Sequence, residues 1–138
     1  ISDPGFKLIR EAVKEKIKIE AIPGASSPIA ALVVSGLPTD KFMFVGFLPK
    51  PPGHRINMLK NIETAVNAIK QTVIIFESPF RIVQVLKELQ EIFGDIDIVI
   101  VRELTKLYEE IRREKISEAL VHFNKKKPRG EFVILFHL

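Results

Sequence analysis

Three times along this chain, a polar residue and a proline come just before apolar residues at helical spacing. These pairs are Asp3-Pro4, Ser27-Pro28 and Ser78-Pro79. A polar N-cap followed by proline in the first turn is typical of a helix start. β-rich apolar runs precede the second and third pairs, at residues 17–22 and 72–76. Strands that alternate with helices predict an α/β domain, in which a mixed sheet is flanked by helices.

The rest of the chain continues this alternation. Apolar spacing, with glycine at several ends, predicts helices over 6–17, 29–35, 55–70, 79–93 and 116–123. Further strands are expected at 42–48, 96–101 and 132–136, and residues 105–113 are compatible with strand or helix. We expect residues 49–53 to be loop, because their prolines fit no regular element. The helix over 29–35 is small and apolar on every side, which predicts that it is buried.

The composition excludes several classes of protein. The 138 residues contain no cysteine, which excludes disulfides, zinc knuckles and thiol nucleophiles and fits a reducing cytoplasm. His54, His122 and His137 lack metal-ligand spacing, so we expect no metal. No apolar run approaches the ~18 residues of a membrane span, so we expect no anchor. The net charge of +4 permits nucleic acid as a partner without indicating it.

The segment Pro23-Gly24-Ala25-Ser26-Ser27 is a candidate ligand site. It joins a predicted strand to a predicted helix, and its small residues would let a flat ligand approach the backbone. Helix starts of this kind offer free N–H groups where ligands of α/β sheets gather. The alternative is that these residues only make a turn and start a helix. The G-x-G-x-x-G and G-x-x-x-x-G-K-[ST] patterns are absent, so the sequence supports neither a dinucleotide site nor a P-loop.

Charged residues follow two of the predicted strands, and two interpretations of them stay open. Arg81 comes four residues after Glu77, and it could bind a phosphate or pair with Glu77. The segment Arg102-Glu103-Leu104-Thr105-Lys106 is either a binding site or a cluster of ion pairs. The basic run at 125–129 predicts a solvated turn, with contact to phosphate as the alternative.

Taken in order, these motifs resemble the tetrapyrrole methylase superfamily of S-adenosylmethionine-dependent methyltransferases. The motifs are Ile1-Ser2-Asp3-Pro4-Gly5, Pro23-Gly24-Ala25-Ser26-Ser27, Ser35-Gly36-Leu37-Pro38, Phe44-Val45-Gly46-Phe47-Leu48-Pro49, Phe76-Glu77-Ser78-Pro79-Phe80-Arg81, Arg102-Glu103-Leu104-Thr105-Lys106 and Lys127-Pro128-Arg129-Gly130-Glu131-Phe132-Val133. The last four look like the branch that methylates a cytidine ribose of small-subunit ribosomal RNA. The resemblance implies that residues 1–23 end an N-terminal methylase domain, whose remainder is absent, and that residues 24–138 form the C-terminal domain.

The resemblance also implies a cofactor, a substrate and partners. S-adenosylmethionine would lie in the cleft between the two domains, contacted largely by backbone. A cytoplasmic homodimer that binds ribosomal RNA or the small ribosomal subunit, with no metal and no membrane, is the assembly expected from the family. The implied cofactor-binding residues are Asp3, Pro4, Gly5, Ser26, Ser27, Ala30, Phe47, Leu48 and Gly130, and those expected to bind RNA phosphates are Lys50, Arg81, Arg102 and Lys106.

Methyl transfer to a ribose hydroxyl requires alignment of the hydroxyl and removal of its proton. Glu77 and Glu103 are the candidate catalytic bases of this chain, with solvent or a residue of the absent N-terminal half as alternatives. We expect the isolated chain to be inactive without that half. Two other functions stay open: methylation of a porphyrin or corrin precursor, and a non-catalytic interaction module.

Overall fold

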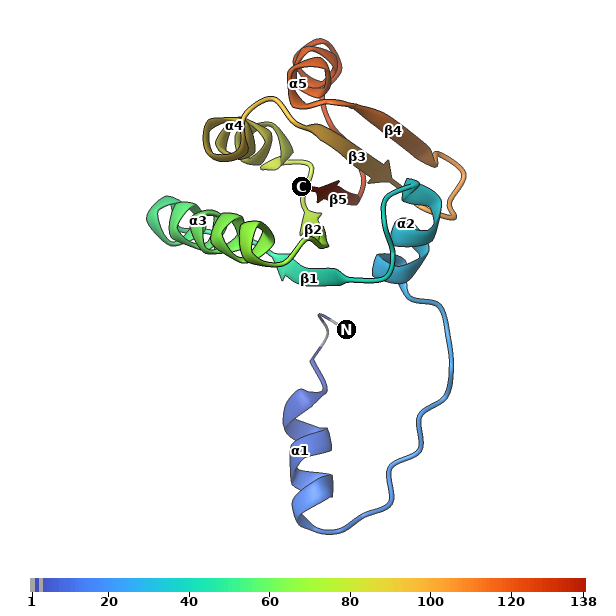
Figure 1. Cartoon of the computed structure of the whole chain (residues 1–138). Helices are drawn as coiled ribbons and strands as arrows, with labels where there is room; N and C mark the ends of the chain where they lie inside the picture. Colours follow the sequence, from blue (N-terminus) through green and yellow to red (C-terminus); the bar gives the residue numbers. More distant parts are fainter. Residues whose placement is uncertain (1, 3) are drawn as a thin grey trace.

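The computed structural model describes residue 2 and residues 4–138, whose strands form one sheet (Figure 1). The strands are β1 (Phe42–Phe47), β2 (Thr72–Glu77), β3 (Asp97–Arg102), β4 (Glu110–Lys115) and β5 (Phe132–His137). Their order across the sheet is β1-β2-β5-β3-β4. β1 is parallel to β2, β5 is antiparallel to β2 and β3, and β4 is antiparallel to β3. The sheet is therefore mixed, as predicted, and β1, β2 and β3 run in the same direction.

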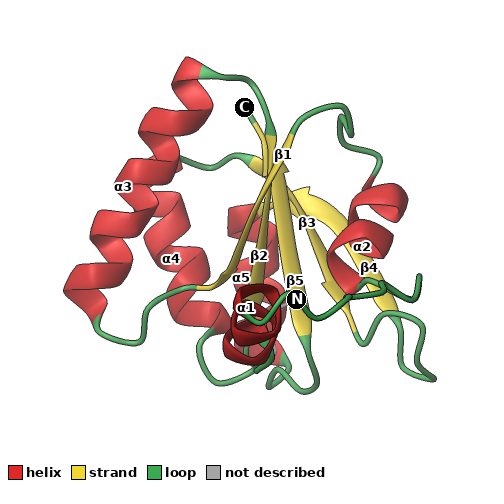
Figure 2. Cartoon of the chain, turned by 90° about the horizontal axis from the view of Figure 1, so that it is seen from below, coloured by secondary structure: helices red, strands yellow, loops and turns green. Residues whose placement is uncertain are grey.

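Helices cover both faces of this sheet (Figure 2). These helices are α2 (Ser27–Ser35), α3 (Pro52–Ala68), α4 (Ile82–Phe93) and α5 (Ile116–Lys125), and a further helix, α1 (Phe6–Lys14), precedes them. On one face, α3, α4 and α5 share a core with the strands, in which Leu59 and Leu86 cluster with Ile75. On the other face, Leu32 of α2 clusters with Ile74. Because successive strand residues point to opposite faces, Ile74 and Ile75 serve the two cores of this α/β sandwich.

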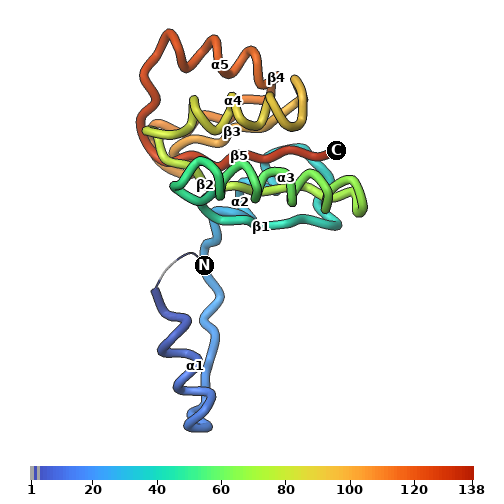
Figure 3. Tube along the Cα trace, turned by 90° about the vertical axis from the view of Figure 1, so that its left-hand side faces the viewer, coloured from blue at the N-terminus to red at the C-terminus, as the bar shows by residue number. Residues whose placement is uncertain are grey.

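Helix α1 stands apart from the sheet. Figures 1 and 3 show it on the far side of a long extended segment, residues 17–26, that leads back to α2. Its large apolar side chains, Phe6, Leu8, Ile9 and Val13, are exposed. The division of the chain into domains at residue 23 stays a prediction.

Two expected helix ends are wrong: α1 stops at Lys14 rather than at residue 17, and Ser26 rather than Ser27 is the N-cap of α2. Four further expectations about local structure are also wrong. The alternating run at 17–22 is extended but forms no strand, because its only described neighbour is the helix α1, and no described strand pairs with it (Figures 1 and 3). The loop after β1 is shorter than expected, since Pro52 starts α3 in the first turn, where its missing N–H costs nothing. Ser78 does not cap α4: residues 79–81 form a turn, and α4 begins at Ile82. α2 is buried on one side only, with Val33 70% exposed.

Two further findings concern the segment that follows β3 and the length of the helices. Residues 105–109 form turns, and the strand β4 follows them, so the ambiguous segment 105–113 is half turn and half strand. Within residues 2 and 4–138, none of the helices is both long and apolar enough to cross a membrane.

Candidate functional site

A cavity of about 380 Å³ lies at the edge of the sheet where β1, β2 and β3 end. Because β5 runs the opposite way, its first residues reach the same edge, and the start of α2 closes one side. The carboxyl edge of parallel strands is where ligands of open α/β sheets bind. The lining residues are Ser2, Ser27, Phe47, Phe76, Glu77, Ser78, Pro79, Val101, Leu104, Gly130, Glu131, Phe132 and Val133.

The start of α2 places a hydroxyl group near this cavity. Ser26 is the N-cap of α2 and has an extended backbone, and its carbonyl accepts the N–H of Ala30 at 2.9 Å. The Ser26 Oγ is buried, and it has no hydrogen-bond partner in the described part of the chain. A buried hydroxyl without a partner is costly in a folded protein, so this oxygen is a candidate contact for a bound ligand or an ordered water.

Glu77 ends β2 and lines the cavity with a nearly fully buried side chain. Its Oε1 accepts the N–H of Ser78 at 2.7 Å and the Nε–H of Arg81 at 2.9 Å. Its Oε2 is buried and finds no hydrogen-bond partner within residues 2 and 4–138. The carboxylate is therefore held in place through one oxygen, and a ligand's donor group can reach the other only if the side chains that cover it move.

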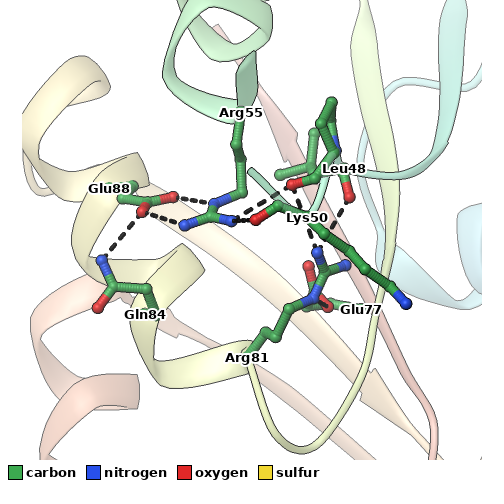
Figure 4. A network of polar contacts seen from close by, with 8 residues as sticks. Leu48, Lys50, Arg55, Glu77, Arg81, Gln84 and Glu88 are labelled. Carbon is green, nitrogen blue, oxygen red and sulfur yellow. Dashed lines mark hydrogen bonds and ion pairs between the residues drawn. The ribbon is translucent and has the colours of Figure 1, made fainter. Parts of the chain in front are cut away.

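Two arginines hold the segment that follows β1 (Figure 4). Arg81 Nη1 donates to the carbonyl of Leu48 at 3.1 Å, and Arg55 Nη1 donates to the carbonyl of Lys50 at 2.8 Å. Arg55 also makes two hydrogen bonds to the buried carboxylate of Glu88, at 2.6 and 2.7 Å. This bonding holds the pKa of Glu88 below its usual value and raises that of Arg55. Glu77 and Glu88 thus each orient a guanidinium, and the two guanidiniums fix the backbone of 48–50.

One wall of the site is built from the segment that follows β3 and the segment that precedes β5. It consists of Glu103, Lys106 and Glu131. The Glu103 N–H donates to the Glu131 carbonyl at 3.0 Å, and the Glu131 N–H donates to Glu103 Oε1 at 2.8 Å. Lys106 Nζ lies 3.3 Å from Glu103 Oε1 and 2.8 Å from Glu131 Oε2. The Glu131 N–H, aided by Lys106, lowers the pKa of Glu103, and the hydrogen bond to Glu131 raises the pKa of Lys106.

The lack of a side chain at Gly130 lets the Glu103 carboxylate pack closely against the backbone of residue 130. Its φ is +91°, and a Cβ built on it would lie 2.6 Å from Cγ and Oε1 of Glu103. Glu103 itself has φ of +49°, and Thr105 has φ of +64°. Left-handed backbone at non-glycine residues costs energy and is concentrated at functional sites.

The structure brings together some of the residues expected at a site and separates others. Ser27, Phe47, Glu77 and Gly130 line the cavity, with Ser26 and Ala30 in the same turn of α2. Pro4 and Gly5 are exposed before α1, Leu48 is buried in the α3/α4 core, and Asp3 lies outside the described residues. Among the basic residues, Lys50 is exposed, Arg81 pairs with Glu77, Lys106 pairs with Glu103 and Glu131, and Arg102 pairs with Glu110 at 3.1 Å.

The site residues that sequence reasoning missed come mainly from β3 and β5. Val101, Leu104, Glu131 and Phe132 line the cavity, yet they look like ordinary core and turn residues in the sequence. Strand direction would have pointed to them, since an antiparallel β5 presents its first residues at the carboxyl edge of its neighbours. In the described residues, no cluster of three or more His, Asp or Glu side chains has an arrangement suited to a metal ion.

Comparison with known proteins identifies relatives across nearly the whole chain. The sequence profile of the tetrapyrrole (corrin/porphyrin) methylases matches residues 1–120. The ribosomal RNA small subunit methyltransferase I of Thermotoga maritima is 42% identical over 135 residues, covering 98% of this chain and 59% of that protein. The protein of the same name from Rickettsia prowazekii is also 42% identical, with 98% and 47% covered. The chain thus spans about half the length of the curated relatives it matches.

Solved structures share the fold at low sequence identity. A conserved hypothetical protein of Aeropyrum pernix superposes with a TM-score of 0.73 at 16% identity, covering 99% of this chain and 54% of that one. Cobalt precorrin-4 methyltransferase superposes with a TM-score of 0.63 at 20% identity, with 96% and 57% covered. The profile match and the sequence relatives confirm the resemblance seen in the motifs, and the chain belongs to the tetrapyrrole methylase family.

Proposed function

We propose that this chain forms part of an S-adenosylmethionine-dependent enzyme that methylates the 2′-hydroxyl of a cytidine ribose in small-subunit ribosomal RNA. The observation that carries the proposal is the cavity at the carboxyl edge of the sheet, which gathers Ser27, Phe47, Glu77 and Gly130 from four separate family motifs. The names of the relatives at 42% identity support the ribosomal substrate. The family's methyltransferase activity supports the type of reaction.

The cavity suits a cofactor that is bound largely by backbone. Its volume of about 380 Å³ lies within the usual range for small-molecule sites. Apolar side chains such as Phe47 and Val101 form much of the lining, and two buried, unpartnered oxygens, Ser26 Oγ and Glu77 Oε2, belong to residues at or next to it. When bound, S-adenosylmethionine supplies a methyl group already activated by a positive sulfur. The chain's own part is to hold it, exclude water and align the acceptor.

Glu77 is the residue we assign to the acceptor hydroxyl. Arg81 and the Ser78 N–H fix one of its oxygens. The other is buried and unpartnered, and once uncovered it would accept a hydrogen bond from the hydroxyl and take its proton as the oxygen–carbon bond forms and the sulfur–methyl bond breaks. A positioned base typically contributes about 10²–10⁴-fold in rate. Glu103 is less suited to this role, because its oxygen already accepts the Glu131 N–H and its pKa is lowered. We assign Glu103 to holding the wall.

The basic residues divide into two groups. Arg81 is a positioning residue, since its donors go to Glu77 and to the carbonyls of Leu48 and Pro49. Three other basic residues are proposed to contact phosphates of the RNA: Lys50, exposed in the segment after β1, Lys106 of the wall, and Arg102 at the end of β3. A cytoplasmic homodimer is proposed from the resemblance, with Phe42 and Phe47 of the edge strand β1 exposed for contact.

The experiment is transfer of labelled methyl from S-adenosylmethionine by the full-length gene product. It is offered small ribosomal subunits that lack the modification and, separately, a tetrapyrrole precursor. Label recovered as a ribose ether in the RNA supports the proposal. Label in the tetrapyrrole, or in neither acceptor, contradicts it.

A matched pair of variants tests the role of Glu77. Glu77→Gln keeps the size of the side chain and loses the base, so kcat is expected to fall by about 10²–10⁴-fold with little change in cofactor binding. Glu91→Gln, an exposed change on α4, is the control and is expected to leave kcat unchanged. An active Glu77→Gln enzyme would remove Glu77 from catalysis.

A further inference from the structure

A second cavity, of about 530 Å³, adjoins the first on the other side of Gly130. It lies where β3 ends and β4 begins, against the last turn of α5 and the basic segment that connects α5 to β5. Its lining residues are Arg102, Glu103, Tyr108, Glu110, His122, Phe123, Lys126, Lys127, Pro128, Arg129 and Gly130.

The charges that line this second cavity leave an excess of positive charge. Its two acids are already paired, Glu103 with Lys106 at 3.3 Å and Glu110 with Arg102 at 3.1 Å. Although burial opposes it, hydrogen bonds from Arg102 and Arg112 hold the pKa of Glu110 below its usual value. The cations Lys126, Lys127 and Arg129 are exposed, and none has an ion pair with another described residue.

The basic segment is anchored rather than loose. The Lys126 N–H donates to the His122 carbonyl at 3.0 Å, which ties the start of the segment to α5. Arg102 Nε donates to the Arg129 carbonyl at 2.6 Å, which ties its end to β3. Two fixed ends hold the three cations over one cavity, an arrangement that a free solvated turn would not maintain.

An aromatic side chain completes the rim. Tyr108 lines the cavity, and 69% of its surface is exposed. Sequence-tolerant binding of single-stranded nucleic acid uses this combination, in which cations follow the phosphates and an aromatic face stacks on a base.

From this arrangement we infer that the second cavity is a subsite for single-stranded RNA, in which Lys126, Lys127 and Arg129 bind phosphate groups and Tyr108 stacks on a base. The inference rests on the proposed function, because it takes the RNA to be the strand that carries the methylated nucleotide. Gly130 lines both cavities, and of the wall residues Glu103 lines this cavity and Glu131 lines the methyl-transfer cavity. One strand can therefore cross the wall, with one nucleotide at the methyl-transfer cavity and its neighbour in this subsite.

The test compares RNA binding by two triple variants of the full-length gene product. Lys126, Lys127 and Arg129 are changed to alanine in one. The control changes Lys60, Lys70 and Lys87, which are exposed elsewhere on the surface, so that both variants lose the same charge. Binding of a short fluorescent single-stranded RNA of mixed sequence is measured by anisotropy over a range of salt concentrations. Binding of S-adenosylmethionine by calorimetry and circular dichroism spectra verify that the site and the fold are intact.

For the subsite variant, the slope of log K against log salt should flatten by about 2, at ~0.7 for each lost phosphate contact to a single strand. The control should keep the parent's slope, and both should bind S-adenosylmethionine normally. Equal slopes in the two variants, or no RNA binding by the parent, would overturn the inference. RNA binding that depends on the subsite without any methyl transfer to RNA would contradict the proposed function and leave the subsite standing.

Tyr108 gives a second, independent measurement. Tyr108→Ala should weaken RNA binding by about tenfold, whereas Tyr108→Phe, which keeps the ring, should bind as the parent does. Because the side chain is exposed, neither change should alter the circular dichroism spectrum. Equal affinities of the alanine and phenylalanine variants would rule out stacking at this position.

Discussion

The ion pair between Arg55 and Glu88 buries two charged side chains in the fold. Both side chains are almost fully buried, at 6% and 5% exposure, and two short hydrogen bonds join them. Arg55→Met would leave the Glu88 carboxylate buried with only Gln84 as a hydrogen-bond donor among the described residues. Removing one partner of a buried pair costs about 3–5 kcal/mol. With a urea m-value of about 2 kcal/mol/M, a loss of 4 kcal/mol lowers the unfolding midpoint by about 2 M.

The double variant Arg55→Met/Glu88→Leu separates the cost of the unpaired charge from the other contacts of Arg55. It leaves no buried charge at positions 55 and 88 and loses mainly the hydrogen bond from Arg55 to the Lys50 carbonyl, worth about 1.5–3 kcal/mol. We therefore expect the double variant to be more stable than Arg55→Met alone. Urea unfolding followed by far-UV circular dichroism measures all three proteins.

The pH dependence has a definite sign. Arg55 holds the pKa of Glu88 below its usual value, so the pair stabilises the fold above pH ~4.3 and loses this effect as the pH falls through the lowered pKa. In Arg55→Met, burial raises the pKa of Glu88, and the variant loses stability as the pH rises. The gap between the two proteins should narrow between pH 7 and pH 4. Three outcomes would refute this reasoning: a difference in the free energy of unfolding that stays constant with pH, a loss below about 1 kcal/mol in Arg55→Met, or a double variant that is no more stable than Arg55→Met.

Three further predictions concern glycines and a helix cap. Gly130→Ala should lower the free energy of unfolding by about 1–3 kcal/mol, measured by urea unfolding. It should also move the pKa of Glu103 back toward its usual value, because the new Cβ displaces that carboxylate. Carboxyl NMR measures this pKa, and an unchanged value would contradict the close contact. Gly36→Ala should cost about 1 kcal/mol, since Gly36 ends α2 at φ +79°, and Gly36→Asn should cost less in the same unfolding assay. Ser117→Ala should raise the pKa of Asp95 only part of the way by NMR titration, because the Ser117 N–H, which lowers it most, remains; a full return would show that the hydroxyl dominates.

Much of the fold follows from local sequence patterns. The runs at 72–76 and 132–136 are strands within a residue or two, and the glycine after Phe93 ends α4 as expected. These features depend on residues close together in the chain, so a local pattern is enough to predict them. The segment 17–22 has the same alternation as a strand and fails, because strand pairing depends on a neighbour that the pattern does not contain.

The site was predictable only where a motif marks it. Glu77 stands at a strand end beside a Ser-Pro pair, and the structure places it in the cavity. Arg81 has the same signal, yet its donors are used within the chain, and the alternative of a structural pair describes it. Leu48 lies within a motif but faces the core, and Glu131 lies on the wall because β5 is antiparallel. Side-chain direction and strand direction are tertiary properties, so these assignments could not be made from the sequence.

The central position of β5 has a consequence for how this chain is made. β5 leaves the ribosome last of the described strands, but it lies between β2 and β3 and supplies residues to both cores, Phe136 to one and Leu135 to the other. Until it emerges, the nascent chain holds two unjoined half-sheets, each with an open edge of the kind that chaperones shield. A stop codon after residue 131 would therefore yield no shortened domain, only a chain whose two half-sheets are prone to aggregate.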